Sequence, residues 1–277
     1  MKNPYLLCAL SIPLFFCSCI GRQYVANPHY VPLHKEKGEI SCSIGQRDFQ
    51  LGYSLTNHLL IFTSGKYREV AYDLEGLDMN REASQDRSYE LGGGAGYFKS
   101  FHKILSFETL CGTAFGKLSY QYERGFVQDL HLFDMNTRKY NIYIQQNIGV
   151  TIKRYFEFAI SAKLIKYELY NINCRNNVDF TTDSYVDVNT YFIGKQKASY
   201  TFFEPGFTFR VGFHNWKAQL QGVWVSKLSN NPIYYRDTNV FLSVNMNLDI
   251  LKKSKDDKKS KANLLNKFQN STFGIIQ

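Results

Sequence analysis

The chain has 277 residues, of which 44% are hydrophobic and 16% aromatic, and it carries a formal net charge of +9. It is too apolar for a disordered chain, and its mean hydropathy of −0.32 is too low for a bundle of membrane helices. The excess of Lys and Arg raises nucleic acid or an anionic membrane surface as a partner.

The first twenty residues have the layout of an export signal. Lys2 is the only charge before Arg22, and Pro13 interrupts the apolar stretch between them. A membrane-spanning helix needs about 20 apolar residues without a central proline, so this segment is too short and is broken. The pattern predicts a signal peptide.

The end of this segment resembles the bacterial lipobox, in which a small residue precedes the cysteine. Ser18 precedes Cys19 here, whereas Cys17 follows the bulky Phe16. The resemblance implies cleavage before Cys19, with diacylglycerol and an acyl chain on that cysteine and no other cofactor. We therefore expect a lipoprotein signal peptide over residues 1–18 and a lipidated linker over residues 19–37. The alternative is an ordinary signal peptide with incidental cysteines.

From residue 38 to residue 250 the chain alternates between apolar and other residues with a period of two, which is typical of strands. Val240, Leu242, Val244, Met246 and Leu248, for example, interleave with mostly polar residues. Ten such runs occur: 38–46, 49–56, 58–71, 88–98, 104–121, 138–152, 155–170, 197–213, 216–227 and 236–250. Several reach the roughly 9 to 11 residues that a tilted strand needs to cross a bilayer.

The connections between the runs alternate in length. Very short turns follow the second, fourth, sixth and eighth runs. Mostly long polar segments, at 72–87, 122–137, 171–196 and 228–235, follow the third, fifth, seventh and ninth runs. Short periplasmic turns and long outer loops are typical of outer-membrane barrels. The sequence predicts an all-β, antiparallel, up-and-down transmembrane barrel of about ten strands, with 8 to 12 as the range.

Together the lipobox-like end at Cys19, the linker Tyr30-Val31-Pro32-Leu33 and the hairpin Gln50–Ile61 (QLGYSLTNHLLI) resemble the small lipid-anchored outer-membrane β-barrel proteins of Bacteroidetes. The resemblance covers the whole mature chain. It implies the outer membrane of a Gram-negative bacterium and the barrel fold, far more than an activity.

In such a barrel the apolar phase faces lipid and the polar phase faces the lumen. The inward phase then carries three acids and three bases that we expect to pair with one another, the alternative being a narrow pore whose selectivity they set. These six residues are Glu90, Glu108, Glu157, Lys163, Arg210 and Lys217.

Aromatic residues lie near the ends of the runs, as in the girdles of membrane proteins. On the turn side the candidates are Tyr97, Phe101, Tyr155, Phe213 and Trp216. For an outer girdle they are Tyr120, Tyr122, Tyr170, Tyr200, Tyr234 and Tyr235.

Catalytic and metal-binding patterns are weak. His131 shares its predicted loop with Asp129 and Asp134, but no serine accompanies them, and no cysteine spacing supports zinc or a disulfide framework. We expect no catalysis and no metal. The remaining cysteines, Cys42, Cys111 and Cys174, are expected to be packing residues.

The lysine-rich residues 251–277 account for much of the positive charge and are expected to form a periplasmic tail. Nothing there suggests nucleic-acid binding. We expect a barrel that is anchored through Cys19 in the inner leaflet of the outer membrane and contacts outer-membrane lipids, with a structural or narrow-channel role. The alternatives are a ligand or protein partner at loops 72–87, 122–137 and 171–196 and, least favoured, a lipid-modifying enzyme. The sequence does not define an oligomeric state.

Overall fold

A computed structural model describes residues 22–75, 80–101, 104–126, 129–152, 155–176, 191–213 and 215–249. The predicted signal peptide, Cys19 and the tail 251–277 lie outside these residues.

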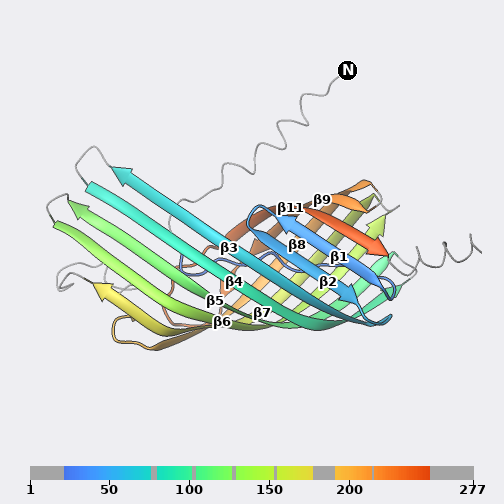
Figure 1. Ribbon diagram of the computed structural model, residues 1–277, viewed down its shortest axis with the longest axis horizontal. Coiled ribbons are helices and arrows are strands. Elements are labelled where there is room, and N and C mark those ends of the chain that lie inside the picture. Colours follow the sequence, from blue (N-terminus) through green and yellow to red (C-terminus); the bar gives the residue numbers. More distant parts are fainter. Residues whose placement is uncertain are drawn as a thin grey trace, which may run out of the picture.

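The described chain forms one closed antiparallel barrel of ten strands (Figure 1). Each strand pairs with its neighbours in the sequence, and the sheet closes through the pairings β8–β9, β9–β11 and β11–β1. The short β10 (Ser226–Lys227) pairs with β8 just beyond the end of β9. The ten barrel strands are β1 (Glu39–Gly45), β2 (Asp48–Ser54), β3 (Leu59–Glu75), β4 (Asn80–Phe101), β5 (Leu105–Phe126), β6 (Asp129–Ile152), β7 (Phe156–Asn176), β8 (Lys197–Phe213), β9 (Trp216–Trp224) and β11 (Thr238–Asp249). The predicted fold class and strand number are confirmed.

The burial of side chains is inverted relative to a soluble protein over most of the barrel. On β6, for example, Ile142, Ile144 and Ile148 are exposed, whereas Gln145 and Asn147 on the other face are buried. The outward apolar positions of β6 lie between Ile142 and Ile152, over ten residue steps, and we call the band of exposed apolar side chains at this level of the barrel the apolar belt. That length is roughly 33 Å along the strand, or about 25 Å along the barrel axis at a tilt of about 40°.

The two ends of the barrel differ. At the turn end, β2–β3, β4–β5, β6–β7 and β8–β9 are joined by connections of two to four residues. At the opposite end, which we call the extended end, β3 to β7 continue well past their short neighbours β1, β2 and β9, on the left of Figure 1.

The extension corrects the prediction of long outer loops. Residues 80–87 belong to β4, residues 122–126 and 129–137 belong to β5 and β6, and residues 171–176 belong to β7. Beyond the apolar belt the apolar side chains lie on the inner face of the strands and the polar ones on the outer face. Lys117 and Ser119 face outward, whereas Leu118 and Tyr120 are buried inside. A water-facing sheet buries its apolar face, so the polar outward residues of these strands resemble a loop in the sequence.

The structure corrects the prediction of a linker for the part of residues 19–37 that it describes. Residues 22–37, which we call the luminal segment, pass through the inside of the barrel, and most of the side chains between Gln23 and His34 are buried. The segment forms no regular strand apart from one bridge between Tyr24 and Tyr235, so its backbone must find partners among the side chains of the barrel wall.

Candidate functional site

The luminal segment runs the full length of the barrel interior. At the extended end, the backbone amide of Tyr24 donates to the carbonyl of Tyr234 at 3.0 Å, and that of Arg236 donates to the carbonyl of Tyr24 at 3.1 Å. At the turn end, the amide of Lys37 donates to Asn57 Oδ1 at 3.0 Å, and that of Gly38 donates to the carbonyl of Ser54 at 2.9 Å. The segment therefore enters at one end of the barrel and joins β1 at the other.

At the extended end the segment is held by charge and by aromatic packing. The backbone amide of Arg22 donates to Asp86 Oδ2 at 3.1 Å, and Arg68 pairs with the other oxygen of Asp86 at 2.8 Å and also donates to the carbonyl of Arg22. The ring of Tyr24 stacks on Phe202 with centroids 3.9 Å apart, inside an apolar cluster built mainly from β5 to β8. This cluster packs Tyr24 and Ala26 of the luminal segment against the inner wall.

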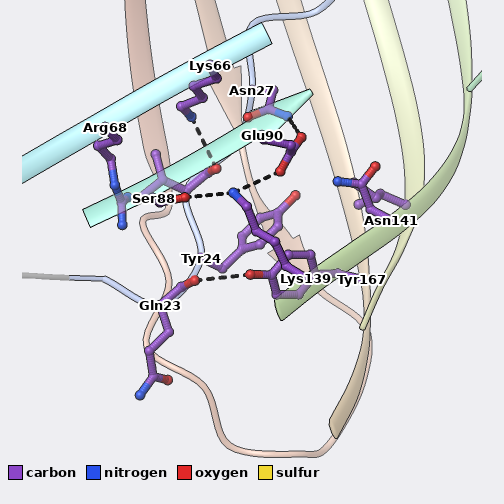
Figure 2. Close-up of a pocket in the computed structure, with 12 residues that line it drawn as sticks. Gln23, Tyr24, Asn27, Lys66, Arg68, Ser88, Glu90, Lys139, Asn141 and Tyr167 are labelled. Carbon is purple, nitrogen blue, oxygen red and sulfur yellow. Dashed lines mark hydrogen bonds and ion pairs between the residues drawn. The ribbon is translucent and has the colours of Figure 1, made fainter. Parts of the chain in front are cut away.

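The first third of the segment lies over a small polar cavity (Figure 2). Lys66 Nζ donates to the carbonyl of Ala26 at 2.6 Å, Asn27 donates to Glu90, and Lys139 pairs with Glu90 at 2.9 Å. The cavity measures about 20 Å³, which is room for a single water molecule.

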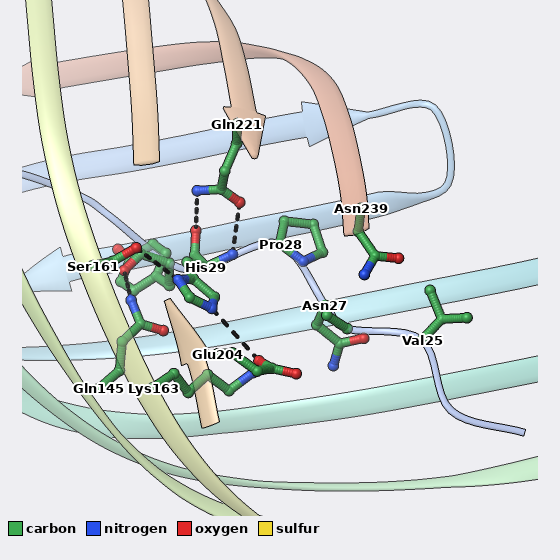
Figure 3. A network of polar contacts seen from close by, with 12 residues as sticks. Val25, Asn27, Pro28, His29, Gln145, Ser161, Lys163, Glu204, Gln221 and Asn239 are labelled. Atoms are coloured by element: carbon green, nitrogen blue, oxygen red, sulfur yellow. Dashed lines mark hydrogen bonds and ion pairs between the residues drawn. The ribbon is translucent and has the colours of Figure 1, made fainter. Parts of the chain in front are cut away.

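In the middle of the luminal segment, the barrel wall forms hydrogen bonds with the backbone of His29, as a neighbouring strand would (Figure 3). Its amide donates to Gln221 Oε1 at 2.7 Å, and Gln221 Nε2 donates back to its carbonyl at 3.1 Å. The imidazole lies 2.6 Å from Ser161 Oγ and 3.5 Å from Glu204 Oε2, and Glu204 also pairs with Lys163 at 3.2 Å. Both sides of the segment are thus bonded at this point.

The last third is bonded just as densely. The carbonyl of Tyr30 accepts from Gln145 at 2.7 Å and from Asn147 at 2.9 Å, and Arg210 donates to the carbonyl of Val31. The amide of His34 donates to Glu108 Oε1 at 3.1 Å.

Leu33 adopts φ of 54°, in the left-handed region. A non-glycine residue is held there only when its surroundings determine the conformation, and Leu33 is buried against Val31 and Ala159.

The six charged residues expected in the lumen are all buried inside the barrel, and the structure shows their partners. Glu157 pairs with Arg210 at 3.2 Å and with Lys217, and Lys163 and Glu90 pair with Glu204 and Lys139 as described above. Glu108 has no basic partner in the described chain; it accepts from Asn147 at 2.9 Å and from the backbone of His34. The network therefore also binds the luminal segment.

Several residues of this site were not predicted from the sequence. The wall also includes Lys66, Arg68, Lys139 and Glu204, and His29 and His34, expected in the lipidated linker, are buried inside the barrel. One signal was present: residues 23–34 (QYVANPHYVPLH) contain no Asp, Glu, Lys or Arg, whereas a solvated linker usually does.

The aromatic residues expected on the turn side are all exposed, with Phe213 at 76% and Trp216 at 61%. The outer girdle was predicted wrongly, because Tyr120 and Tyr200 are buried in the apolar cluster. Outward aromatics at that level are instead Phe49, Tyr67, Tyr89, Phe115, Phe203 and Trp224.

His29 lies between Ser161 Oγ and Glu204 Oε2, at 2.6 and 3.5 Å, and all three side chains are buried inside the barrel. No group of three or more His, Cys, Asp or Glu residues in the described part of the chain is placed to hold a metal ion. His131 lies on β6 and not in a loop, and its side chain is outside what the structure describes. Cys42, Cys111 and Cys174 are free, and burial with the nearby Asp134 raises the pKa of the Cys174 thiol to about 11.

Among the described residues no helix is long and apolar enough to span a bilayer. The comparisons with known proteins assign no relative to this chain: no family model matches it, and no curated protein is similar to it.

Proposed function

We propose that this chain is a lipid-anchored outer-membrane β-barrel protein with a structural role, closed by its own N-terminal segment. The observation that supports membrane insertion most directly is the inverted burial, with an apolar belt outside and a polar interior. A soluble protein rarely exposes a continuous apolar surface of this extent.

The filled lumen favours the structural role over the narrow channel. Ten strands would otherwise leave room inside, since about eight strands already give an interior that side chains just fill. Here the luminal segment occupies that room, and its backbone groups are bonded to Gln145, Asn147, Arg210 and Gln221.

Two measurements test this proposal. The mature protein should need detergent and should migrate differently on a gel before and after boiling; a detergent-free monomer would refute membrane insertion. Reconstituted into planar bilayers, it should give no conductance steps. Steady conductance that changes with Glu108→Gln would instead support the channel.

The lipid anchor has its own test. Labelling with radioactive palmitate should be lost in Cys19→Ala and retained in the matched control Cys17→Ala. Equal labelling of both variants would refute Cys19 as the attachment site.

A second function, binding of a ligand or partner at the extended end, is supported by two apolar side chains beyond the belt. Ile193, shortly before β8, and Leu228, whose amide donates to the carbonyl of Thr201 on β8, are exposed by 46% and 58%. Glycan and protein arrays probed with the solubilised chain test this function. Signal that survives in the Ile193→Asp, Leu228→Asp double variant would argue against binding at this end.

A further inference from the structure

The described chain begins and ends at opposite ends of the barrel. Glu39, where β1 begins, is paired with Asp249, where β11 ends, so the described chain ends at the turn end. Arg22 contacts Asp86 and Arg68 at the extended end, so the described chain begins there.

The luminal segment is long enough to make this crossing. From Tyr24 to Gly38 the chain has fourteen residue steps, which reach at most about 46 to 50 Å, roughly twice the 25 Å of the apolar belt. The contacts with β4, β9 and the turn after β2 fix its direction at both ends and in the middle.

Arg22 lies at the height along the barrel axis where the apolar belt ends. Its partner Asp86 is next to Arg87, whose guanidinium lies on the outer surface and pairs with Glu69 at 2.5 Å. Tyr89, the last exposed aromatic residue of β4 on this side, is only three residues from Asp86. Charged residues directly beyond an aromatic residue mark the transition from lipid to water.

We infer that the N-terminal chain is threaded through the barrel and that the attachment site at Cys19 lies on the outer side of the membrane, so that its acyl chains enter the outer leaflet. Cys19 is three residues before Arg22 and therefore lies within about 11 Å of it. This replaces the expectation of an anchor in the inner leaflet. The inference rests on the proposed membrane function and on the usual orientation of outer-membrane barrels, with their short turns in the periplasm.

The luminal segment is held through its backbone, so the threading can be tested with side-chain replacements that leave these bonds intact. The hydrogen bonds that join Arg22 to Asp86 and Arg68, and Lys37 to Asn57, are made by the main chains of Arg22 and Lys37. Replacing either side chain by cysteine should therefore leave the segment in place. The two positions form a matched pair at opposite ends of the same segment.

The experiment uses the full-length chain with Cys42, Cys111 and Cys174 replaced by serine, expressed in a Gram-negative host. A membrane-impermeant maleimide is applied to intact cells and to permeabilised cells. Arg22→Cys should be labelled in both, and Lys37→Cys only after permeabilisation. If the two positions are labelled on the same side, threading is refuted; if only Lys37→Cys reacts in intact cells, the outer placement is refuted.

The outcome can be separated from failure of the proposed function. Heat-modifiable migration of each variant reports whether the barrel has formed, independently of the labelling. A chain that forms no membrane barrel would fail that assay, whereas an unthreaded barrel would pass it and fail only the labelling. As a second measurement, an epitope tag between Gly21 and Arg22 should bind antibody on intact cells, and the same tag after Gln277 should not. Antibody binding by only the second tag would overturn the inference.

Discussion

Gln221 is the residue whose removal should loosen the luminal segment most directly. Its buried side chain bonds both the amide and the carbonyl of His29, at 2.7 and 3.1 Å. In Gln221→Ala both backbone groups remain buried without these partners. Each unsatisfied group costs about 1 to 3 kcal/mol, so the variant should lose about 2 to 6 kcal/mol of docking free energy. This corresponds to a roughly 30- to 20,000-fold larger population of the released segment.

The assay follows a cysteine placed at Ala26, which is completely buried in the luminal segment. Residues 20–277 carrying Ala26→Cys, with Cys42, Cys111 and Cys174 replaced by serine, are refolded in detergent and treated with a maleimide polymer. If the segment opens and closes faster than it reacts, the labelling rate reports the released population and should rise by the factor above.

The matched control is Asn245→Ala, an equally buried amide on the neighbouring strand β11, with no hydrogen-bond partner for its Oδ1. It should leave the labelling rate nearly unchanged. Equal rates in Gln221→Ala and the parent, with unchanged heat-modifiable migration in both, would show that these two bonds do not hold the segment.

The remaining predictions concern the belt, the charge network, the packing of the luminal segment and one thiol. Ile160→Arg, in the middle of the outward belt, should cost about 2 to 4 kcal/mol in urea titrations of the bilayer-inserted protein, whereas Ile193→Arg beyond the belt should cost little; equal costs would refute the placement of the belt. Glu157→Ala leaves Arg210 and Lys217 without their shared carboxylate and should destabilise the barrel by about 3 to 5 kcal/mol, visible as a lower urea midpoint; an unchanged midpoint would contradict pairing. Gly52→Ala would place a methyl group on the hydroxyl of Tyr30 and should speed the labelling at position 26; a rate equal to the parent would mean that Tyr30 has room to move. Because its pKa is raised to about 11, Cys174 should be alkylated more slowly at pH 8 in the folded chain than in urea, and equal rates would contradict its burial.

The strands of the apolar belt could be predicted from the sequence because an apolar outer surface and a polar lumen place opposite kinds of side chain at alternate residues. Where the chain leaves the belt, the two kinds exchange faces, as between Phe115, which is exposed, and Leu118 and Tyr120, which are buried. Because the apolar residues move from the outer to the inner face, the pattern no longer matches that of one continuous strand. The predicted runs therefore ended at 121 and began again at 138.

Six charged residues of the lumen, Glu108 and Arg210 among them, could be predicted for the same reason, because a polar residue in the inward phase of a barrel strand faces the lumen. The luminal segment could not be predicted in this way. It has no periodicity, because its backbone is bonded to side chains such as Gln145 and Gln221 and not to a regular ladder. Its partners are also remote: Gln221 is 192 residues from His29.

This separation along the chain has a consequence for how the protein is assembled. The segment emerges first during synthesis, yet its partners on β8 and β9, Arg210 and Gln221, are among the last residues to be made. It also leads directly into β1, the strand that seals the cylinder against β11. An already sealed cylinder has no room to admit it, so the wall must wrap around the segment as the seam closes. Contacts this distant in sequence form slowly. The exposed, unsealed sheet should therefore be the long-lived intermediate of this protein and the state that depends most on chaperones.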